Sequence, residues 1–254
     1  ENRIVKIEDD SSSTVATFEY DALGRRIRKV DAVAAVTTLY YYDPDWRCLE
    51  ERNGSDVVQR SFIYGNYIDE VLVMTVPGSP PTDYYYLQDH LYSPAALLAA
   101  DGTVVERYEY DAYGTVHVFD GSWNRRAASA YGNPYTFTGR RLDWLDNACL
   151  KIMYYRYRYY DPFPGRFLQE DPVGHVDGLN LYVYAGGTPT IAQDPLGLRK
   201  VIVRYYVRYG RNSVTQNLYM LPPVTSGDWW TVYQNTLQIL MGGPTACLHP
   251  TSLK

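Results

Sequence analysis

The residues best suited to chemistry lie in a tyrosine-rich segment that covers residues 156–198. Three of its aspartates stand directly before a proline: Asp161, Asp171 and Asp194. Arg158 and Arg166 precede the second of these steps and could pair with a carboxylate. An aspartate before proline is typical of a turn, because the carboxylate accepts bonds from nearby backbone N–H groups and proline fixes φ. On the residues alone, the three aspartates are therefore expected to cap turns, although so many marked turns exceed what a plain β-sandwich needs.

The elements that must position this segment carry a repeated Tyr-Asp motif. Residues 18–25 read FEYDALGR and residues 108–115 read YEYDAYGT, and looser copies end in Asp-Pro. In each copy an aromatic-rich strand ends in Tyr-Asp, and a glycine or proline follows within a few residues, which predicts a fixed turn. Asp21 and Asp43 are 22 positions apart, a spacing that holds about two strands and two turns. The repeat therefore predicts a sheet built from consecutive hairpins.

Strand-like runs fill the intervals between these turns. They cover Ile4–Ile7, Val57–Tyr64, Val71–Val76, Tyr84–Leu87, Val104–Tyr110 and Ile152–Tyr160. Residues Leu179–Ala185 also alternate in the manner of a strand. Residues Ala95–Ala100 favour a short helical turn, and Gly121–Tyr131 lacks strand periodicity, which indicates a loop.

The character of the sequence changes after Leu198. Lys200–Tyr209 has the pattern of a basic, β-branched strand, and Ser213–Leu221 could pair with it. Asp228 is suited to cap a helix whose apolar positions follow on one face. A boundary is therefore predicted at Leu198.

Composition excludes several classes of function. The net charge of −5 and the pI near 5.4 give no general electrostatic reason to bind nucleic acid or an anionic membrane. The 27 tyrosines against 6 phenylalanines suit strands whose rings pack while their hydroxyls reach water or a polar partner. The histidines share no ligand spacing, so neither a metal site nor a cofactor is expected. They are His90, His117, His175 and His249.

Cysteines and apolar runs set further bounds. Cys48, Cys149 and Cys247 lie far apart, and their odd number argues against a full disulfide framework. Free buried thiols are expected, with one bridge left open. No apolar run reaches the roughly 20 residues of a membrane span, and no signal peptide is recognisable. The chain opens on Glu1 without an initiator methionine, which indicates a piece of a longer protein.

The Tyr-Asp repeats and the terminal segment together resemble the Rhs or YD-repeat family, which includes bacterial Rhs toxins, the C components of insecticidal toxin complexes and the animal teneurins. The specific part of the resemblance to the family's Rhs-associated core is a block in matching order and spacing: RYYDP at 158–162, GRF at 165–167, DPVG at 171–174, NLYVY at 180–184 and the closing DPLGL at 194–198. Tyr92 stands where many members of the family carry glycine, so the turn there could differ.

The resemblance implies an all-β fold, in which a spirally wound antiparallel sheet of hairpins forms a hollow shell with a plug-like segment at one end. It divides the chain into a YD-repeat shell segment at 1–150, the end of the Rhs-associated core at 151–198 and a variable, small α+β region at 199–254. In bacterial relatives the shell encloses a C-terminal cargo, often a toxin. The implied partners are thus the chain's own C-terminal region and further YD-repeat shell or a second shell protein. Secretion or exposure at the cell surface follows by the same analogy.

The resemblance also implies self-cleavage directly after the closing Pro-x-Gly-Leu turn, between Leu198 and Arg199. Cleavage in the family is attributed to an aspartyl-protease-like pair with a supporting arginine, and the matching positions are Asp171, Asp194 and Arg158. Such chemistry needs two carboxylates that share one proton, so that one activates water and the other protonates the leaving amide. A nearby arginine could stabilise the negative charge. The enzyme would at most be an intramolecular autoprotease, without turnover on external substrates.

Two other functions remain open at this stage. A structural or adhesive cell-surface protein would use the repeats for rigidity or binding, and its aspartates would only hold turns. A carbohydrate-binding protein would use exposed tyrosines, for example in the run Tyr154–Tyr160. The first alternative predicts that Asp171 and Asp194 lie well apart, whereas cleavage requires them to be adjacent.

Overall fold

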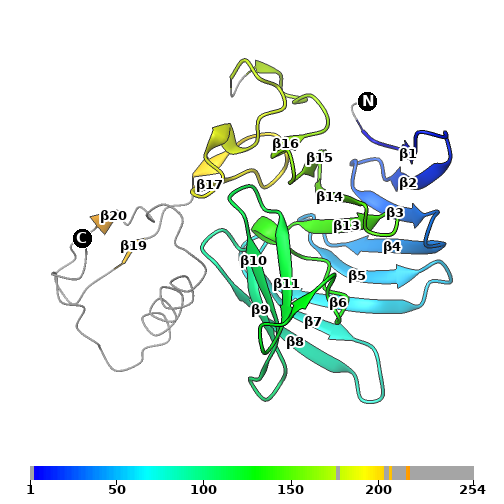
Figure 1. Ribbon diagram of the computed structural model, residues 1–254, viewed down its shortest axis with the longest axis vertical. Helices are drawn as coiled ribbons and strands as arrows, with labels where there is room; N and C mark the ends of the chain where they lie inside the picture. Colours follow the sequence, from blue (N-terminus) through cyan, green and yellow to red (C-terminus); the bar gives the residue numbers. More distant parts are fainter. Residues whose placement is uncertain (1–2, 176–177, 203–205, 208–215, 218–254) are drawn as a thin grey trace. The chain divides into compact units, whose positions relative to one another are not determined.

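The computed structural model describes residues 3–175, 178–202, 206–207 and 216–217 (Figure 1). A twelve-stranded antiparallel sheet holds its strands in chain order, and a four-stranded sheet follows it. The strands of the long sheet are β1 Lys6–Glu8, β2 Thr14–Tyr20, β3 Arg26–Asp31, β4 Val36–Tyr42, β5 Cys48–Asn53, β6 Val58–Tyr64, β7 Val71–Val76, β8 Thr82–Gln88, β9 Pro94–Leu98, β10 Val104–Tyr110, β11 Val116–Asp120 and β12 Arg125–Arg126. The predicted all-β fold of consecutive hairpins is confirmed.

The remaining elements are short. The second sheet consists of β13 Arg141–Leu145, β14 Leu150–Tyr155, β15 Arg158–Asp161 and β16 Arg166–Phe167. Four further strands have two residues each: β17 Ala192–Gln193, β18 Val201–Ile202, β19 Tyr206–Val207 and β20 Gln216–Asn217. Two 3₁₀ helices are described, η1 Phe137–Gly139 and η3 Ala185–Gly187.

The aspartate of the repeat closes its turn as the motif predicts. Its Oδ1 accepts the backbone N–H groups two and four residues later, as Asp21 does from Leu23 and Arg25. The same pair of bonds recurs at Asp9, Asp43, Asn53, Asp89, Asp111 and Asp120. The third residue after the aspartate has a positive φ, which favours glycine. Tyr92 occupies that position with φ 63° and stacks on Tyr67, so the turn keeps its hydrogen bonds without glycine.

At four positions the tyrosine that ends a strand ties its turn to the preceding one. The Tyr42 hydroxyl donates to the carbonyl of Arg26, 16 residues earlier, at 3.0 Å. The same spacing joins Tyr20 to Ile4, Tyr64 to Cys48 and Tyr110 to Pro94. Burial raises the pKa of Tyr42 well above its usual range, so the hydroxyl keeps its proton and remains a donor. Phenylalanine could fill the same space but not make this bond, which accounts for part of the excess of tyrosine.

We expect Tyr42→Phe to lower the free energy of unfolding by about 1 kcal/mol, because it removes the donor of this hydrogen bond. Chemical denaturation measures the change. Tyr41→Phe is the matched control, since Tyr41 is 43% exposed and its hydroxyl bonds the exposed Asp56. Its effect should stay within about 0.5 kcal/mol. Equal losses in the two variants would contradict the role of the inter-hairpin bond.

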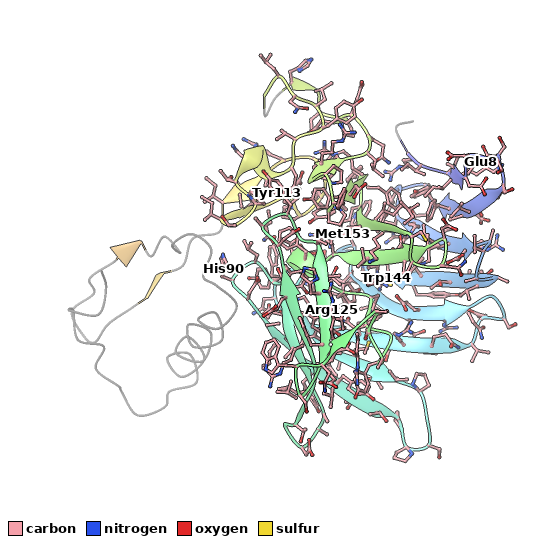
Figure 2. All side chains as sticks on the ribbon, viewed as in Figure 1. Glu8, His90, Tyr113, Arg125, Trp144 and Met153 are labelled. Carbon is pink, nitrogen blue, oxygen red and sulfur yellow. The ribbon has the colours of Figure 1, made fainter. Side chains whose placement is uncertain are left out.

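Three hydrophobic clusters form the core, and two of them contain residues of both the second sheet and the long sheet. Phe18 of β2 packs with Tyr154 and Tyr159 in the first cluster. The second gathers side chains of β6, β7, β8, β9, β10 and β11 around Tyr135, just before η1. The third contains Met153 of β14, with Trp144 of β13 packed against it (Figure 2). The second sheet therefore forms the core together with the buried face of the hairpin series.

Two expectations for short segments are wrong. Ala95–Ala100 does not form a helical turn, because Pro94–Leu98 pairs with both β8 and β10 as strand β9. Leu179–Ala185 is not a strand but a series of turns with one isolated bridge between Val183 and Arg166. Asn180 breaks the alternation there, since its side chain caps a turn by accepting the N–H of Tyr182.

The run Ile152–Tyr160 forms two strands rather than one. Arg156 adopts φ 62°, and a tight turn there separates β14 from β15. Tyr155 and Arg158 are paired across this turn. The turn matters for the site, because it brings Arg158 back beside the segment that precedes Leu198.

Several remaining expectations fall partly outside the described residues. Strands β19 and β20 pair Tyr206 with Asn217, in line with the strand pattern after Leu198. The helix expected after Asp228 and the thiol of Cys247 lie outside the described residues. Cys48 is free and buried as expected, whereas Cys149 is free but exposed. Among the described residues, no helix has the length and apolar character to cross a membrane.

Candidate functional site

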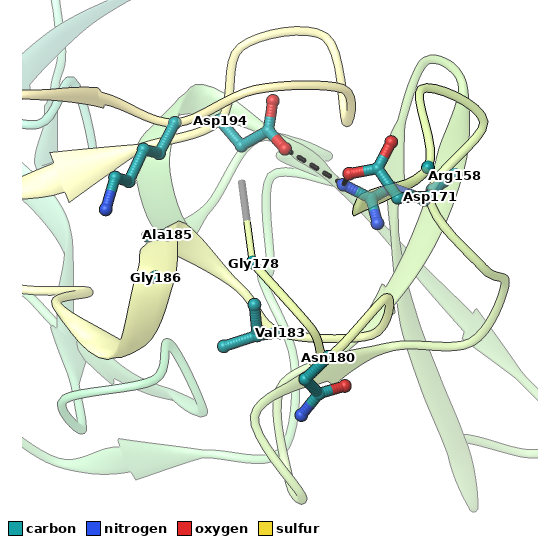
Figure 3. Close-up of a pocket in the computed structure, with 10 residues that line it drawn as sticks. Arg158, Asp171, Gly178, Asn180, Val183, Ala185, Gly186 and Asp194 are labelled. Carbon is teal, nitrogen blue, oxygen red and sulfur yellow. Dashed lines mark hydrogen bonds and ion pairs between the residues drawn. The ribbon is translucent and has the colours of Figure 1, made fainter. Parts of the chain in front are cut away.

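Arg158 brings the two predicted aspartates together. Its Nη2 atom lies 3.0 Å from Oδ2 of Asp171 and 3.2 Å from Oδ2 of Asp194 (Figure 3). Arg158 begins strand β15, Asp171 follows β16, and Asp194 follows β17. Three separate elements thus place two carboxylates on one guanidinium nitrogen.

The remaining atoms of the Arg158 side chain are also held. Its Nε donates to the carbonyl of Gly197 at 2.6 Å, and its Nη1 donates to the carbonyl of Leu181 at 3.1 Å. The guanidinium carbon lies 3.6 Å from the ring centroid of Phe167. Burial lowers the pKa of Arg158 from its usual range, although both carboxylates oppose this shift. An arginine remains charged after such a shift, so the site contains a fixed, buried cation.

Asp194 contacts both sides of the bond predicted to be cut. Its Oδ1 accepts the N–H of Leu198 at 2.9 Å and the N–H of Arg199 at 3.0 Å. The side chain thus makes a wider turn than the aspartates of the repeat, which bond residues two and four positions later. Only 3% of Asp194 is exposed. Asp194 thus caps a turn of a different pattern and also pairs with Arg158.

Gly197 allows this turn to form. It has φ 71°, and a Cβ atom at this position would lie 2.5 Å from the carbonyl oxygen of Tyr155. A side chain would therefore be strained and would displace the turn from β14. The Pro-x-Gly-Leu pattern fits a segment that must pass this close to another backbone.

Asp171 combines both expected roles. Its Oδ1 accepts the N–H of Val173 at 2.9 Å and so caps its own turn, as Asp161 does for Phe163. Its Oδ2 makes the ion pair with Arg158. The side chain is 10% exposed, which makes it the more accessible of the two carboxylates. Arg166 lies exposed on β16. Its cross-strand neighbour on β15 is Asp161.

A small cavity of about 10 Å³ opens beside the three charged groups (Figure 3). Arg158, Asp171 and Asp194 line it together with backbone and side-chain atoms that include Asn180 and Lys200. Space of this size accommodates about one water molecule. The site therefore has room for the one reactant that amide hydrolysis requires.

The chain on either side of the predicted bond forms a hairpin. Gln193 of β17 pairs with Val201 of β18, and Ala192 pairs with Ile202. Leu198 and Arg199 lie in the loop between them. The sequence predicts a strand from Lys200 onward, but no pattern pointed to its pairing with β17, because the two paired strands are only two residues long.

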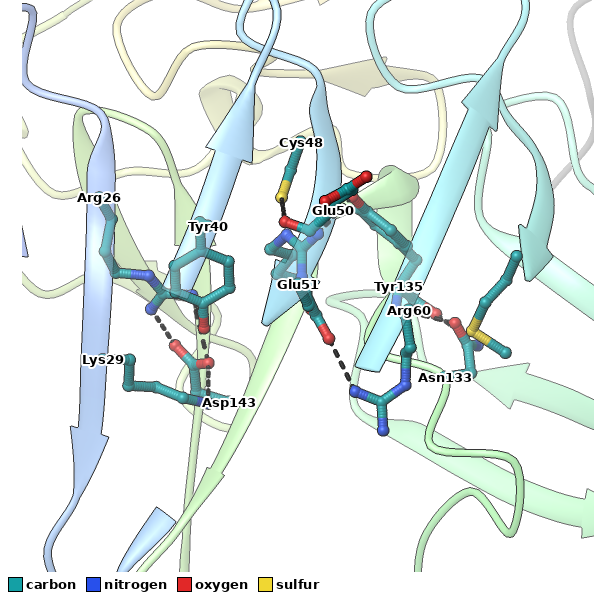
Figure 4. A network of polar contacts seen from close by, with 12 residues as sticks. Arg26, Lys29, Tyr40, Cys48, Glu50, Glu51, Arg60, Asn133, Tyr135 and Asp143 are labelled. Carbon is teal, nitrogen blue, oxygen red and sulfur yellow. Dashed lines mark hydrogen bonds and ion pairs between the residues drawn. The ribbon is translucent and has the colours of Figure 1, made fainter. Parts of the chain in front are cut away.

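A second group of buried charges lies between the long sheet and β13 (Figure 4). Asp143 pairs with Arg26 and, at 2.8 Å, with Lys29. Glu51 pairs with Arg141 and, at 2.7 Å, with Arg60. All of these residues except Arg26 also line a hollow of about 190 Å³. Each carboxylate is shared by two cations, so the group fastens β13 to the long sheet and keeps an excess of positive charge.

The comparisons agree with this architecture. The profile of the family described as teneurin YD-shell matches residues 3–186. The chain therefore belongs to the teneurin YD-shell family. The predicted kinship with Rhs and YD-repeat proteins is thereby confirmed.

Similar YD-shell relatives are much longer than this chain. Toxin subunit YenC1 of Yersinia entomophaga is 35% identical over 212 residues, which cover 75% of this chain and 20% of that protein. The tRNA3(Ser)-specific nuclease WapA of Bacillus spizizenii is 30% identical over 72% of this chain and 7% of its own length. The crystal structure of TcdB2-TccC3 has the same fold over 77% of this chain and 10% of that chain, with a TM-score of 0.56 and 24% identity. The chain thus spans 7% to 20% of the curated relatives named here.

Proposed function

We propose that this chain is the end of a YD shell that encloses the polypeptide following Leu198 and cuts itself between Leu198 and Arg199. One observation carries the proposal. Arg158 contacts both Asp171 and Asp194, while the other oxygen of Asp194 accepts the N–H of Arg199. Two carboxylates, a buried cation and an amide bond in one small site are the components of aspartyl-type hydrolysis.

The geometry favours a division of roles between the aspartates. Asp194 is placed to act as the acid, because its Oδ1 lies 3.0 Å from the nitrogen of Arg199. Asp171 is placed to act as the base, because it is more accessible and lines the cavity that can hold a water molecule. Arg158 stabilises the negative charge of the Asp171 carboxylate. It also stabilises the negative charge that Asp194 acquires when it gives up its proton.

The reaction consumes one water molecule. Asp171 takes a proton from the water as its oxygen adds to the carbonyl carbon of Leu198, which gives a tetrahedral intermediate. Asp194 donates its proton to the nitrogen of Arg199 as the C–N bond breaks. The products are a C-terminal carboxylate at Leu198 and a new amino terminus at Arg199. Since the bond is held in cis, proximity supplies much of the rate.

The shell part of the proposal rests on the hairpin series and on the relatives. The chain supplies twelve consecutive strands of one sheet, and relatives named as toxin subunits or nucleases match it over only a small part of their length. We infer a shell segment at 1–150, a core end at 151–198 and a cargo region from 199 onward. Further YD-repeat shell and the cargo are the inferred partners, and export or display at the cell surface is the inferred location.

A structural role without cleavage is the second candidate. The observation in its favour is that Asp171 caps its own turn, as a non-catalytic aspartate would. In this alternative Arg158 would serve only to neutralise two buried carboxylates and to fix the turn before Leu198.

Intact mass spectrometry of the purified, folded chain separates the two candidates. Cleavage predicts two fragments that end at Leu198 and begin at Arg199, and an uncut chain for Asp171→Asn and for Asp194→Asn. Asp161→Asn is the matched control, because Asp161 stands before proline and caps a similar turn outside the site. It should cut normally. A whole wild-type chain would leave the structural role as the function, whereas continued cutting in both site variants would overturn the roles given to Asp171 and Asp194.

A further inference from the structure

We propose that Asp69, in the loop between β6 and β7, is a positioning residue for cleavage after Leu198 and acts through Arg156. This inference rests on the cleavage proposed above and adds a condition to it. The bond becomes correctly placed only when a hairpin of the long sheet has packed against the core end of the chain.

The starting observation is a series of contacts before the bond. Three successive residues of the turn between β14 and β15 bond three successive carbonyls of the turn that ends at Leu198. Arg156 donates its Nη1 to Pro195, Tyr157 donates its backbone N–H to Leu196 at 3.1 Å, and Arg158 donates its Nε to Gly197 at 2.6 Å. The turn therefore fixes the backbone leading to the bond through three of its main-chain carbonyls.

Asp69 holds the first of these three donors. Its Oδ1 lies 2.7 Å from Nη2 of Arg156, and its Oδ2 pairs with Nη2 of Arg140. Only 1% of Asp69 and 7% of Arg156 are exposed, so this ion pair is little screened by water. The Nη2 atom of Arg156 thus binds a loop of the long sheet, and its Nη1 atom binds the turn before Leu198.

The backbone of Arg156 makes this anchoring necessary. The residue has φ 62°, a backbone conformation that residues other than glycine seldom adopt. A second anchor acts on the backbone side, since Arg3 donates to the carbonyl of Arg156 at 3.2 Å. Without Asp69, Arg156 would lose the partner that fixes its side chain, and its hydrogen bond to the carbonyl of Pro195 could break.

The same loop makes a second contact near the site. Tyr67 accepts a bond at 2.8 Å from the side chain of Gln193, the residue directly before Asp194. The loop also packs tightly on η1, because a Cβ at Gly139 would lie 2.6 Å from the carbonyl oxygen of Asp69. The loop between β6 and β7 therefore positions both ends of the turn that carries the catalytic aspartate. None of these residues contacts the bond itself, so their effect on cleavage is geometric.

The test compares single-turnover cleavage rates in the full chain. Asp69→Asn should slow cleavage at least about tenfold at every pH, since a displacement of one ångström can reduce a rate far more. The pH dependence should keep its wild-type shape, because Asp69 exchanges no proton with the reacting groups. Arg156→Lys is the second variant: it keeps the charge beside Asp69 but lacks the fork that reaches Pro195, and it should also cut slowly. Arg140→Lys, which alters the other partner of Asp69, should change the rate much less.

Hydrogen exchange supplies a readout that a merely stabilising role would not affect. In an uncut Asp171→Asn background, Asp69→Asn should speed exchange of the Tyr157 amide, which bonds Leu196, while amides of β10 and β11 keep their protection. Wild-type rates in both Asp69→Asn and Arg156→Lys, with Asp171→Asn still uncut, would overturn this inference and leave the proposed cleavage intact. An uncut wild-type chain would overturn the proposed cleavage and this inference with it.

Discussion

Arg158→Lys should slow cleavage after Leu198 by about 10²–10³-fold, the range expected when a preorganised charged donor is removed from a reacting site. Arg158 uses its fork to contact Asp171, Asp194 and the carbonyl of Gly197 together. A lysine ammonium is a single point of charge and cannot take up this planar arrangement. The charge would be kept while the geometry is lost.

The measurement is the rate of fragment formation, followed by mass spectrometry after the protein has folded. Arg166→Lys is the control, because Arg166 is exposed on the neighbouring strand β16 and does not contact either carboxylate of the pair. A rate close to wild type in Arg158→Lys would show that charge alone is sufficient. A comparable loss in Arg166→Lys would point to a general effect on the plug segment.

Asp143→Asn should lower the free energy of unfolding by about 3–5 kcal/mol, because it removes the shared partner of two cations in a buried group. Arg26 is fully buried, and it pairs with Asp143 and lies over the rings of Tyr40 and Tyr154. With asparagine at 143 the guanidinium would keep its charge in a place that water does not reach. Glu50→Gln is the control: Glu50 pairs with Arg52 in a partly exposed position, where ion pairs contribute about 0–1 kcal/mol.

The difference between wild type and Asp143→Asn should depend on pH. Burial by itself would raise the pKa of Asp143, but Arg26 and Lys29 outweigh it and lower that pKa from 3.8 to about 2. Because the folded-state pKa lies below the unfolded one, the carboxylate stabilises the fold fully above pH 3.8, and this contribution is lost as the pH falls through about 2. Denaturation curves at pH 6 and pH 2.5 test this: about the same difference at both would contradict the role of the charge.

The repeated part of the fold could be predicted from sequence because its determinants are local. Each Tyr-Asp turn is closed by bonds within four residues, so the motif itself contains the information. The strand β9 was missed, because Ala95 and its alanine-rich surroundings have little strand propensity and take their conformation from β8 and β10. Local propensity gave way there to pairing with neighbours.

The site could be predicted only as far as the family motif reaches. Asp171, Asp194 and Arg158 carry recognisable positions, and the structure places them in contact. Asp69 and Arg156 were not predicted, because they are 87 residues apart and neither belongs to a motif that marks a contact. Long-range pairs of this kind depend on how the second sheet packs against the first, and a single sequence does not encode that packing in any local pattern.

The bond from each repeat tyrosine to the carbonyl 16 residues earlier has a consequence for how such chains change in length. Each of the four bonds of this kind spans the same short distance along the chain, so a whole unit could be duplicated or deleted and the acceptor would keep its spacing. Tyr20 and Tyr64 are tied in addition to Tyr159 and Tyr135. Ion pairs such as that of Asp143 with Arg26 do not tolerate such a change in length, because they join fixed positions 117 residues apart. The number of units is therefore freest to change where no such long-range ion pair begins.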